Sequence, residues 1–281
     1  MVTDKNLAAN VKRSLEDGTA AGIDATVKVR AANSEKLLKS IFHVLKNTHY
    51  GAYSTWKANV SNATRHEAII QSKKKTRVFG TIQPDDAHLD GAWDNCWLDL
   101  HADNSYFEEP PKIQGFGCLF LTPQTHGGLT TLCDGLKIAD VIKKDYPAAY
   151  KLLTEVPVQG GYIKEGQNLI AARPVLRLDP NTGNLKQITF NNGDRVSIRP
   201  CKELPTRSAM EAMYDAYALV HKIAHDPQYH IRFQLKPGAI LCFDNHRLLH
   251  GRTAFSGPRV MGGAYIGLDD YNSSVKCAMV S

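Results

Sequence analysis

Hydrophobic residues recur at helical spacing in three stretches of the chain. In Ala31–Phe42 the apolar side chains fall on one helical face, which predicts an amphipathic helix. Leu136–Leu153 carries a second stripe, interrupted at Pro147, and Ser208–Ala224 carries a third in good helical phase. Such stripes are typical of helices that pack on a protein core.

Most of the remaining pattern is typical of short strands. Ile113–Leu121 reads as a buried or alternating strand, and Val175–Phe190 reads as a hairpin that turns at Asp179–Gly183. Three more strands are expected: Arg232–Leu235, Ala239–Phe243 and Gly263–Gly267. No repeat or linker divides the chain, so we expect one domain over residues 1–281 of the α+β class, mainly β. Irregularly spaced strands with Gly and Pro turns favour a double-stranded β-helix, or jelly roll, with flanking helices.

Composition places the chain among ordinary globular proteins. It has 281 residues, of which 43% are hydrophobic and 22% are charged. No apolar run approaches the roughly 18 residues of a membrane-spanning helix, so no membrane partner is expected. The N-terminus is charged and lacks the apolar segment of a secretory signal, which predicts a cytoplasmic location.

The charge balance gives little support to a nucleic-acid partner. Lys and Arg number 34 against 28 Asp and Glu, a net charge of +6, but the densest basic cluster is only Lys73–Lys75 with Arg77. Nucleic-acid binders concentrate such residues on one face and carry a reading module. A modest positive excess instead suits small anionic or zwitterionic substrates. The sequence leaves open whether the protein is a homodimer.

Cysteine spacing argues against a zinc site or a disulfide framework. None of the six cysteines forms a C-x-x-C pair, and most lie in apolar strings. We expect them to be buried free thiols in a reducing compartment. They are Cys96, Cys118, Cys133, Cys201, Cys242 and Cys277.

Two polar segments carry candidate chemistry, Leu98–Asp103 and Phe243–Arg252. If the first is a strand, His101 and Asp103 point to the same face and can present an imidazole and a carboxylate to one point. A second imidazole from a distant strand would complete the two-histidine, one-carboxylate triad of non-haem Fe(II) oxygenases. Taken alone, a His-x-Asp spacing is common by chance, and a surface histidine beside a capping aspartate explains it as well.

From about Tyr50 to Ala278 the sequence resembles the γ-butyrobetaine and trimethyllysine dioxygenase group of the taurine-dioxygenase-like superfamily. Several separate motifs match in the same order along the chain. They are His101–Gln114, Gly127–Gly135, Phe190–Arg195, Leu235–Gly238 and Phe243–Phe255.

The resemblance implies an Fe(II)- and 2-oxoglutarate-dependent dioxygenase that uses O2 and releases succinate and CO2. His101, Asp103 and His250 fall on the iron ligands. Arg259 falls on the arginine that binds the distal carboxylate of 2-oxoglutarate, and Thr130 falls near that cosubstrate. Guanidinium suits this task because it binds carboxylate through two parallel hydrogen bonds.

We expect structural roles for three residues near His250 in the sequence. Arg247 and Arg252 are expected to brace the strand and the carboxylates around it. His246 precedes His250 by four residues, and period-two alternation does not remove it from the same face. The related proteins commonly have an aromatic residue there, so His246 is interpreted as packing.

The resemblance also implies a substrate site. Trimethylammonium-binding members surround the cation with aromatic rings, whose negative faces attract it. The corresponding cage positions are Tyr50, Trp93 and Tyr265, with Trp56 or Tyr53 near a fourth. Asp90 agrees in its offset from His101, and Asn191 matches a position that contacts the substrate carboxylate.

Departures from the group leave the reaction open. The segment Tyr50–Trp56 is two residues longer than the usual spacing, Trp93 replaces a tyrosine, and the zinc-binding N-terminal domain of the carnitine enzymes is not found. Hydroxylation of a trimethyllysine- or γ-butyrobetaine-like substrate is one interpretation. Oxidative cyclisation or desaturation of an N-alkylated amino acid, as in kainoid synthases, is the second. A non-catalytic small-molecule-binding relative is the third.

Overall fold

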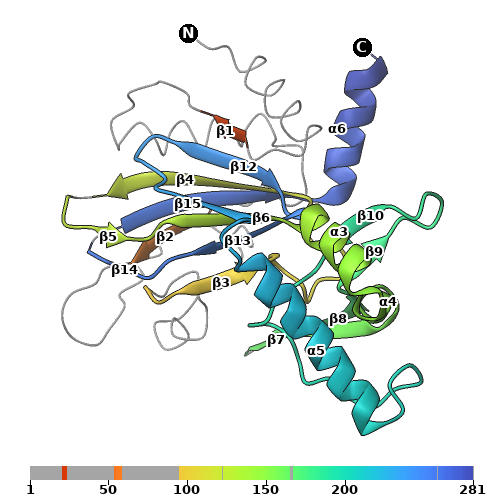
Figure 1. The fold of residues 1–281 in the computed structure, drawn as a ribbon. Helices are drawn as coiled ribbons and strands as arrows, with labels where there is room; N and C mark the ends of the chain where they lie inside the picture. Colours follow the sequence, from red (N-terminus) through yellow and green to blue (C-terminus); the bar gives the residue numbers. More distant parts are fainter. Residues whose placement is uncertain are drawn as a thin grey trace.

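A computed structural model describes residues 21–23, 54–58, 95–121, 123–164, 167–257 and 259–280, with the first two segments described as backbone alone. These residues form a mixed structure of helices and strands in which strands predominate (Figure 1). Within them, no helix is both long and apolar enough to cross a membrane.

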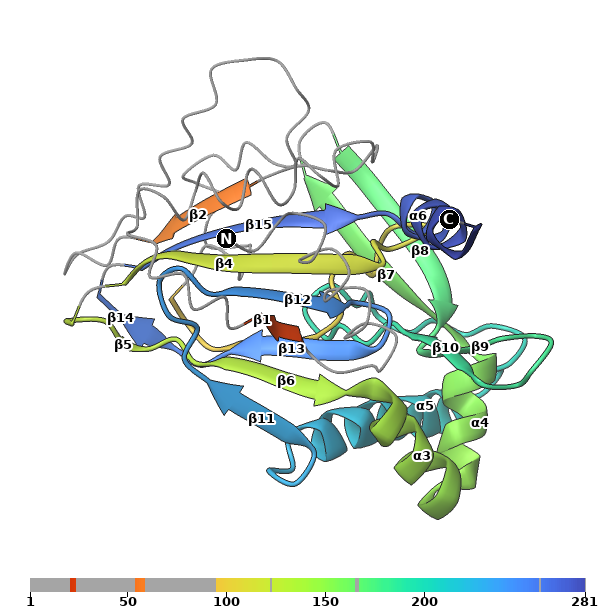
Figure 2. The ribbon, with the colours of Figure 1, turned by 90° about the horizontal axis from the view of Figure 1, so that it is seen from above.

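Two antiparallel sheets form the centre of the structure (Figure 2). The first has the order β1-β12-β4-β15-β2 and the second has the order β11-β6-β13-β3. The strands of the first sheet are β1 Ala21–Ile23, β12 Ile240–Asp244, β4 Ile113–Leu121, β15 Arg259–Ile266 and β2 Ser54–Ala58. Those of the second are β11 His230–Phe233, β6 Thr130–Asp134, β13 Leu248–Arg252 and β3 Leu98–His101.

Apolar side chains from the two sheets meet in one buried cluster. Cys118, Leu241 and Phe243 come from the first sheet, and Leu132 and Leu248 come from the second. Each of these side chains is almost fully removed from water, which is the main favourable contribution to folding. The sheets are therefore held face to face by this shared core.

Three helices cover a second and larger core beside the sheets (Figure 1). They are α3 Gly135–Asp145, α4 Pro147–Glu155 and α5 Arg207–Ala224. The Asp134 side chain caps α3 and the Thr206 hydroxyl caps α5, each accepting a hydrogen bond from a free N–H of the first turn. Their apolar faces bury Ile138, Leu153 and Val220 against this core.

The remaining elements are three two-stranded sheets and a C-terminal helix. The pairs are β5 His126–Gly127 with β14 Phe255–Ser256, β7 Pro157–Lys164 with β8 Gln167–Pro174, and β9 Leu176–Leu178 with β10 Leu185–Ile188. The final helix is α6 Leu268–Val280, which follows β15 and points away from the end of the first sheet in Figure 1.

Several expected elements are confirmed and others are missed. The strand Ile113–Leu121 has the bounds that its pattern predicts, and the stripe after Leu136 divides at Pro147 into α3 and α4. The predicted hairpin turns through the Asp179 carboxylate, which accepts hydrogen bonds from the N–H groups of Asn181 and Thr182. The expected helix Ala31–Phe42 lies outside the described residues.

The cysteine expectation is correct for half of the thiols. All six are free, and Cys118, Cys133 and Cys242 are buried, where burial raises the pKa of the latter two to about 12. The expectation of burial is wrong for three others, which lie at the surface: Cys96, Cys201 and Cys277.

Candidate active site

Two histidines face each other across neighbouring strands of the second sheet. His101 ends β3, and His250 lies in the middle of β13, directly opposite it in the antiparallel register. Paired positions in such a ladder bring side chains within contact distance, and the two ring centroids are 4.3 Å apart. Two imidazoles from distant segments are thus joined by strand pairing.

Asp103 completes the group from the turn that follows β3. Its Oδ1 lies 3.0 Å from His101 Nε2 and 3.6 Å from His250 Nε2. The three candidate ligand atoms all lie within 4.8 Å of one another. The predicted strand ends at His101, so this convergence comes from a turn in which Asn104 takes a positive φ of 57°, and strand alternation does not produce it.

The carboxylate of Asp103 is held on its other side. Its Oδ2 accepts a hydrogen bond of 2.5 Å from the Tyr265 hydroxyl and another from the Gln114 amide. The backbone is held as well, because Asp103 N–H donates to the Asn245 side chain over 2.9 Å and Asn245 donates back to the Asp103 carbonyl. Oδ1 is therefore fixed toward the two imidazoles.

The tautomer of His101 is determined by its other nitrogen. His101 Nδ1 lies 2.7 Å from the carbonyl oxygen of Asp99, and a carbonyl can only accept, so Nδ1 carries the proton. In the neutral ring, Nε2 then presents a lone pair toward the Asp103 carboxylate. A lone pair facing an anionic oxygen is unfavourable unless a cation lies between them. Histidines that bind metals are oriented in this way by a carbonyl or carboxylate.

The charges of the triad are strongly perturbed. Burial lowers the pKa of His101, but the hydrogen bond and negative charge of Asp103 and the Asp99 carbonyl outweigh it, so the pKa is raised overall. Burial raises the pKa of Asp103, but the charge of His250 and the hydrogen bond from His101 bring it well below its ordinary range. Burial and the charge of His101 lower the pKa of His250. The cluster is a buried carboxylate with two imidazoles that cannot both be protonated.

Arg259 begins β15 and is a buried cation with an unpaired nitrogen. Its side chain is 8% exposed, and Nε has no hydrogen-bond partner among the described residues. The guanidinium lies 5.3 Å from the Phe255 ring centroid and packs against Gly128. A Cβ on Gly127, whose φ is +78°, would lie only 2.1 Å from the Ala254 carbonyl oxygen, so glycine is required for β5 to approach this site. A buried cation of this kind needs an anionic partner.

A small pocket opens beside the triad. Its wall includes Asn191, which donates to the carbonyl of Ala102, the residue between His101 and Asp103. The wall also contains two arginines, and Nη1 of Arg173 is buried without a hydrogen-bond partner among the described residues. The lining residues are Ser105, Val158, Gln159, Gly160, Arg173, Thr189, Asn191, Arg195 and Tyr217.

A family model described as "Taurine catabolism dioxygenase TauD, TfdA family" matches residues 43–265, which is most of the chain. The chain belongs to the TauD/TfdA family. The matched range includes the three triad residues and Arg259, so the buried group of two imidazoles and a carboxylate lies inside the part of the chain that carries the family pattern.

Sequence relatives of this TauD/TfdA member include two named dioxygenases. A trimethyllysine dioxygenase from Meyerozyma guilliermondii is 32% identical over 250 residues, covering 88% of this chain and 54% of the relative. A gamma-butyrobetaine dioxygenase from Pseudomonas sp. (strain AK-1) is 32% identical over 181 residues, covering 63% of this chain and 45% of the relative. The chain spans about half the length of these curated relatives.

A solved structure shows that the fold is shared more widely. The PvcB protein from Pseudomonas aeruginosa superimposes with a TM-score of 0.53 at 18% identity, covering 94% of this chain and 80% of that one. At this identity the likeness concerns the arrangement of the backbone.

The structure of this TauD/TfdA member describes only some of the predicted substrate residues. Tyr50, Asp90 and Trp93 lie outside the described residues, as does the alternative Tyr53, and Trp56 is described as backbone of β2 opposite Met261. Thr130 begins β6 and pairs with Arg252, whose guanidinium lies on the Phe255 ring that Arg259 also contacts. Thr130 and Arg259 are thus brought to the same end of the two sheets.

The Asn191 side chain is fully used by its own surroundings. Its Oδ1 accepts hydrogen bonds from the N–H groups of Gly193 and Asp194, and its Nδ2 donates to the Asp194 carboxylate and to Ala102. An amide has two donor hydrogens and two acceptor lone pairs, so each is occupied. Contact with a substrate carboxylate would require one of these bonds to exchange.

The neighbours of His250 have the structural positions that were expected of them. His246 lies in the turn between β12 and β13, where strand alternation does not apply, and its Nε2 contacts the Pro110 carbonyl at 2.9 Å. Arg247 forms two hydrogen bonds to Asp134, and Arg252 donates to the Cys96 carbonyl.

Sequence reasoning did not find the residues that hold the triad in place. These are Gln114, Asn245 and the backbone of Asp99, and Tyr265 was assigned only to the substrate. Gln114 ends the matching segment His101–Gln114, and Asn245 lies in the matching segment Phe243–Phe255. Their position inside these family-matching segments was the sequence signal that could have identified them.

Proposed function

We propose that this chain is an Fe(II)- and 2-oxoglutarate-dependent dioxygenase in which His101, Asp103 and His250 hold the metal. The observation that carries the proposal is the convergence of their three ligand atoms within 4.8 Å. Two imidazoles and a carboxylate on one side leave positions open for cosubstrate and O2, which is the donor set of non-haem Fe(II) oxygenases.

The surroundings of the triad fit a metal. The lone pair of His101 Nε2 is directed at the carboxylate by the bond from Nδ1 to Asp99, and a divalent cation removes the resulting conflict. When bound, iron with 2-oxoglutarate and O2 supplies oxidation of an unactivated C–H bond, with release of succinate and CO2. The apolar rings of Phe116 and Phe243, at 5.7 and 5.0 Å from the His250 ring centroid, exclude water from this side.

Arg259 is assigned to the distal carboxylate of 2-oxoglutarate, beside Thr130. A dianionic cosubstrate supplies the negative partner that this buried guanidinium lacks among the described residues. Because the fork of Arg259 is fixed against Phe255 and Gly128, it orients the cosubstrate as well as neutralising it.

The substrate is assigned to the small amino-acid-derived class. The pocket beside the triad offers the guanidiniums of Arg173 and Arg195, which suit a carboxylate. The aromatic positions Tyr50, Trp56, Trp93 and Tyr265, with Asp90, are proposed to receive the cationic end. Names of the relatives favour hydroxylation of a trimethyllysine- or γ-butyrobetaine-like compound.

The two facing sheets are proposed to be the halves of a double-stranded β-helix that forms one catalytic domain. Their all-antiparallel ladders and shared apolar core support this arrangement. The flanking helices α3, α4 and α5 close its side.

The test is a turnover assay with Fe(II), 2-oxoglutarate and a panel containing trimethyllysine, γ-butyrobetaine and N-prenylated glutamates. Mass spectrometry distinguishes a product that has gained one oxygen from one that has lost two hydrogens, which would mean cyclisation or desaturation. His101→Ala and Asp103→Asn should abolish succinate formation, while His230→Ala, a histidine on β11, should not. Succinate formation that survives both triad changes would refute the assignment.

A further inference from the structure

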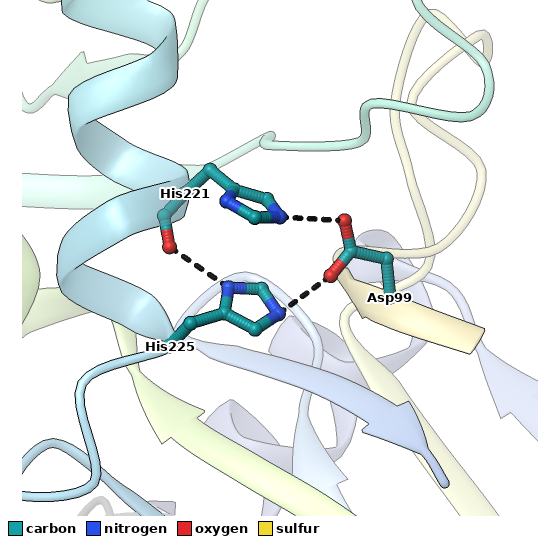
Figure 3. Close-up of side chains that lie close together, drawn as sticks. All are labelled: Asp99, His221 and His225. Carbon is teal, nitrogen blue, oxygen red and sulfur yellow. Dashed lines mark hydrogen bonds and ion pairs between the residues drawn. The ribbon is translucent and has the colours of Figure 1, made fainter. Parts of the chain in front are cut away.

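A second group of side chains that offer metal-ligand atoms lies outside the triad (Figure 3). His221 lies in the last turn of α5, and His225, four residues later, caps the C-terminus of the helix, so both point to one side, toward Asp99 on β3. Asp99 Oδ2 lies 3.0 Å from His221 Nε2, and Asp99 Oδ1 lies 2.6 Å from His225 Nε2. The ligand atoms lie within 4.8 Å of one another, as in the triad.

The bond on the far side of the His225 ring indicates which nitrogen is free. Nδ1 of His225 lies 2.8 Å from the carbonyl oxygen of His221, so Nδ1 carries the proton and donates it (Figure 3). The neutral ring then presents the Nε2 lone pair to the Asp99 carboxylate. His101 has the same arrangement in the triad, with a backbone carbonyl behind the ring and a carboxylate in front.

A simple ion pair explains the His225 contact poorly. If Nε2 carried a proton, the N–H should point at the carboxylate oxygen. The atoms are 2.6 Å apart, yet the contact lacks hydrogen-bond direction, and the buried Nε2 has no hydrogen-bond partner among the described residues. The two imidazole rings of His221 and His225 also stack, with centroids 4.0 Å apart. A cation shared by the two imidazoles and the carboxylate accounts for the stacked rings and for the short His225–Asp99 contact that lacks hydrogen-bond direction.

The three donors are fixed and reachable. Oδ1 of Asp99 accepts a hydrogen bond from the N–H of Leu100 over 2.8 Å, which holds the carboxylate. His221 is held in the last turn of α5, and His225 is held as its C-cap residue. The side chains of Asp99 and His221 are 34% and 44% exposed, so an ion can enter from solvent and keep water in its remaining positions.

We propose that Asp99, His221 and His225 form a second metal site, for a divalent transition ion of the zinc type. Two imidazoles and one carboxylate with an open position suit Zn²⁺, whereas Mg²⁺ and Ca²⁺ prefer oxygen ligands throughout. Asp99 joins the two sites, because its side chain faces this cluster while its carbonyl oxygen accepts the proton of His101 Nδ1. The proposal does not depend on the oxygenase chemistry of the triad.

The experiment counts Zn²⁺ bound to the metal-stripped protein by equilibrium dialysis and elemental analysis. The wild type should bind two ions. His221→Ala and Asp99→Asn should each reduce the number of tightly bound ions by one, and His101→Ala should remove the other ion. The loss of a ligand should weaken its site by about 100-fold or more, because residues that merely orient a ligand cost about 10- to 100-fold. His126→Ala, an exposed histidine on β5, is the matched control and should keep both ions.

The outcomes separate this site from the triad. One ion in the wild type that disappears with His101→Ala, or two ions retained in His221→Ala, would overturn the second site. One ion that disappears with His221→Ala and survives His101→Ala would support it while contradicting the proposed iron centre. Far-UV circular dichroism and melting of both cluster variants check that they fold, and Co²⁺ absorption spectra of the wild type report nitrogen and oxygen ligation directly.

Discussion

The hydroxyl of Tyr265 offers a sharp test of how the metal centre is held. It donates a 2.5 Å hydrogen bond to Asp103 Oδ2, and Gln114 donates to the same oxygen. Tyr265→Phe removes the hydroxyl and keeps the ring. The carboxylate then has one donor in place of two on its outer side, so Oδ1 is less firmly directed at His101 and His250.

The magnitude follows from the chemistry of that bond. A hydrogen bond to a charged group contributes about 1.5–3 kcal/mol, and the loss of a residue that orients a metal ligand costs about 10- to 100-fold in metal affinity. Because Gln114 still donates to the same oxygen, we expect the lower end, about tenfold or roughly 1.4 kcal/mol. Anaerobic titration with Fe(II), or with Mn(II) followed by electron paramagnetic resonance, measures this change in Kd.

A second substitution separates the two roles proposed for Tyr265. Tyr265→Phe keeps an aromatic face for a quaternary ammonium, so the KM of such a substrate should change little at saturating metal. Tyr265→Leu removes both the ring and the hydroxyl and should weaken metal and substrate together. Tyr146→Phe, at an exposed tyrosine immediately before α4, is the control. An unchanged metal Kd in Tyr265→Phe, or the same loss in Tyr146→Phe, would show that the hydroxyl does not position Asp103.

Three further outcomes are expected. Arg259→Lys should raise the KM for 2-oxoglutarate about tenfold or more while changing kcat less, because lysine lacks the bidentate fork; equal KM values in steady-state assays would refute the assignment. Asn191→Ala should lower the free energy of unfolding by about 1–3 kcal/mol in urea titrations, because the N–H groups of Gly193 and Asp194 lose their acceptor. Metal affinity should rise with pH up to the raised pKa of His101 and then level off, since below it the proton competes with the ion; a pH-independent Kd in buffered titrations would contradict this.

Local patterns predicted the elements with a clear apolar stripe or run. α5 presents a regular apolar face to a core, and its periodicity is visible without knowledge of its partners. β4 is a central strand buried on both alternations, and its nearly continuous apolar run was the signal. The hairpin β7–β8 was missed because its two strands pair with each other in a separate sheet and leave Ile163 and Ile170 exposed. Its sequence therefore has no alternating apolar and polar pattern. Helix α6 was also missed, although Asp269 and Asp270 in its first turn are a helix-start signal.

Residue spacing alone predicted the candidate site only where its residues are close in sequence, and His250 and Arg259 were assigned through the family resemblance. His101 and Asp103 are two residues apart, whereas their pairing with His250 depends on the neighbouring strands β3 and β13, which no local pattern specifies. The same limit applies to the second cluster. The spacing of His221 and His225 on one helix could have been noticed, but the position of Asp99 opposite them depends on how α5 lies against β3.

The turn after β12 explains why the fold and the metal centre should be energetically linked. Asn245 lies where the chain passes from β12 in the first sheet to β13 in the second. Its amide binds both backbone groups of Asp103 and the carbonyl of Pro111. The residue that positions the carboxylate therefore also joins the two sheets. A metal that binds only the assembled triad stabilises this crossover by mass action. Loosening the crossover must therefore lower the affinity of the triad for the metal.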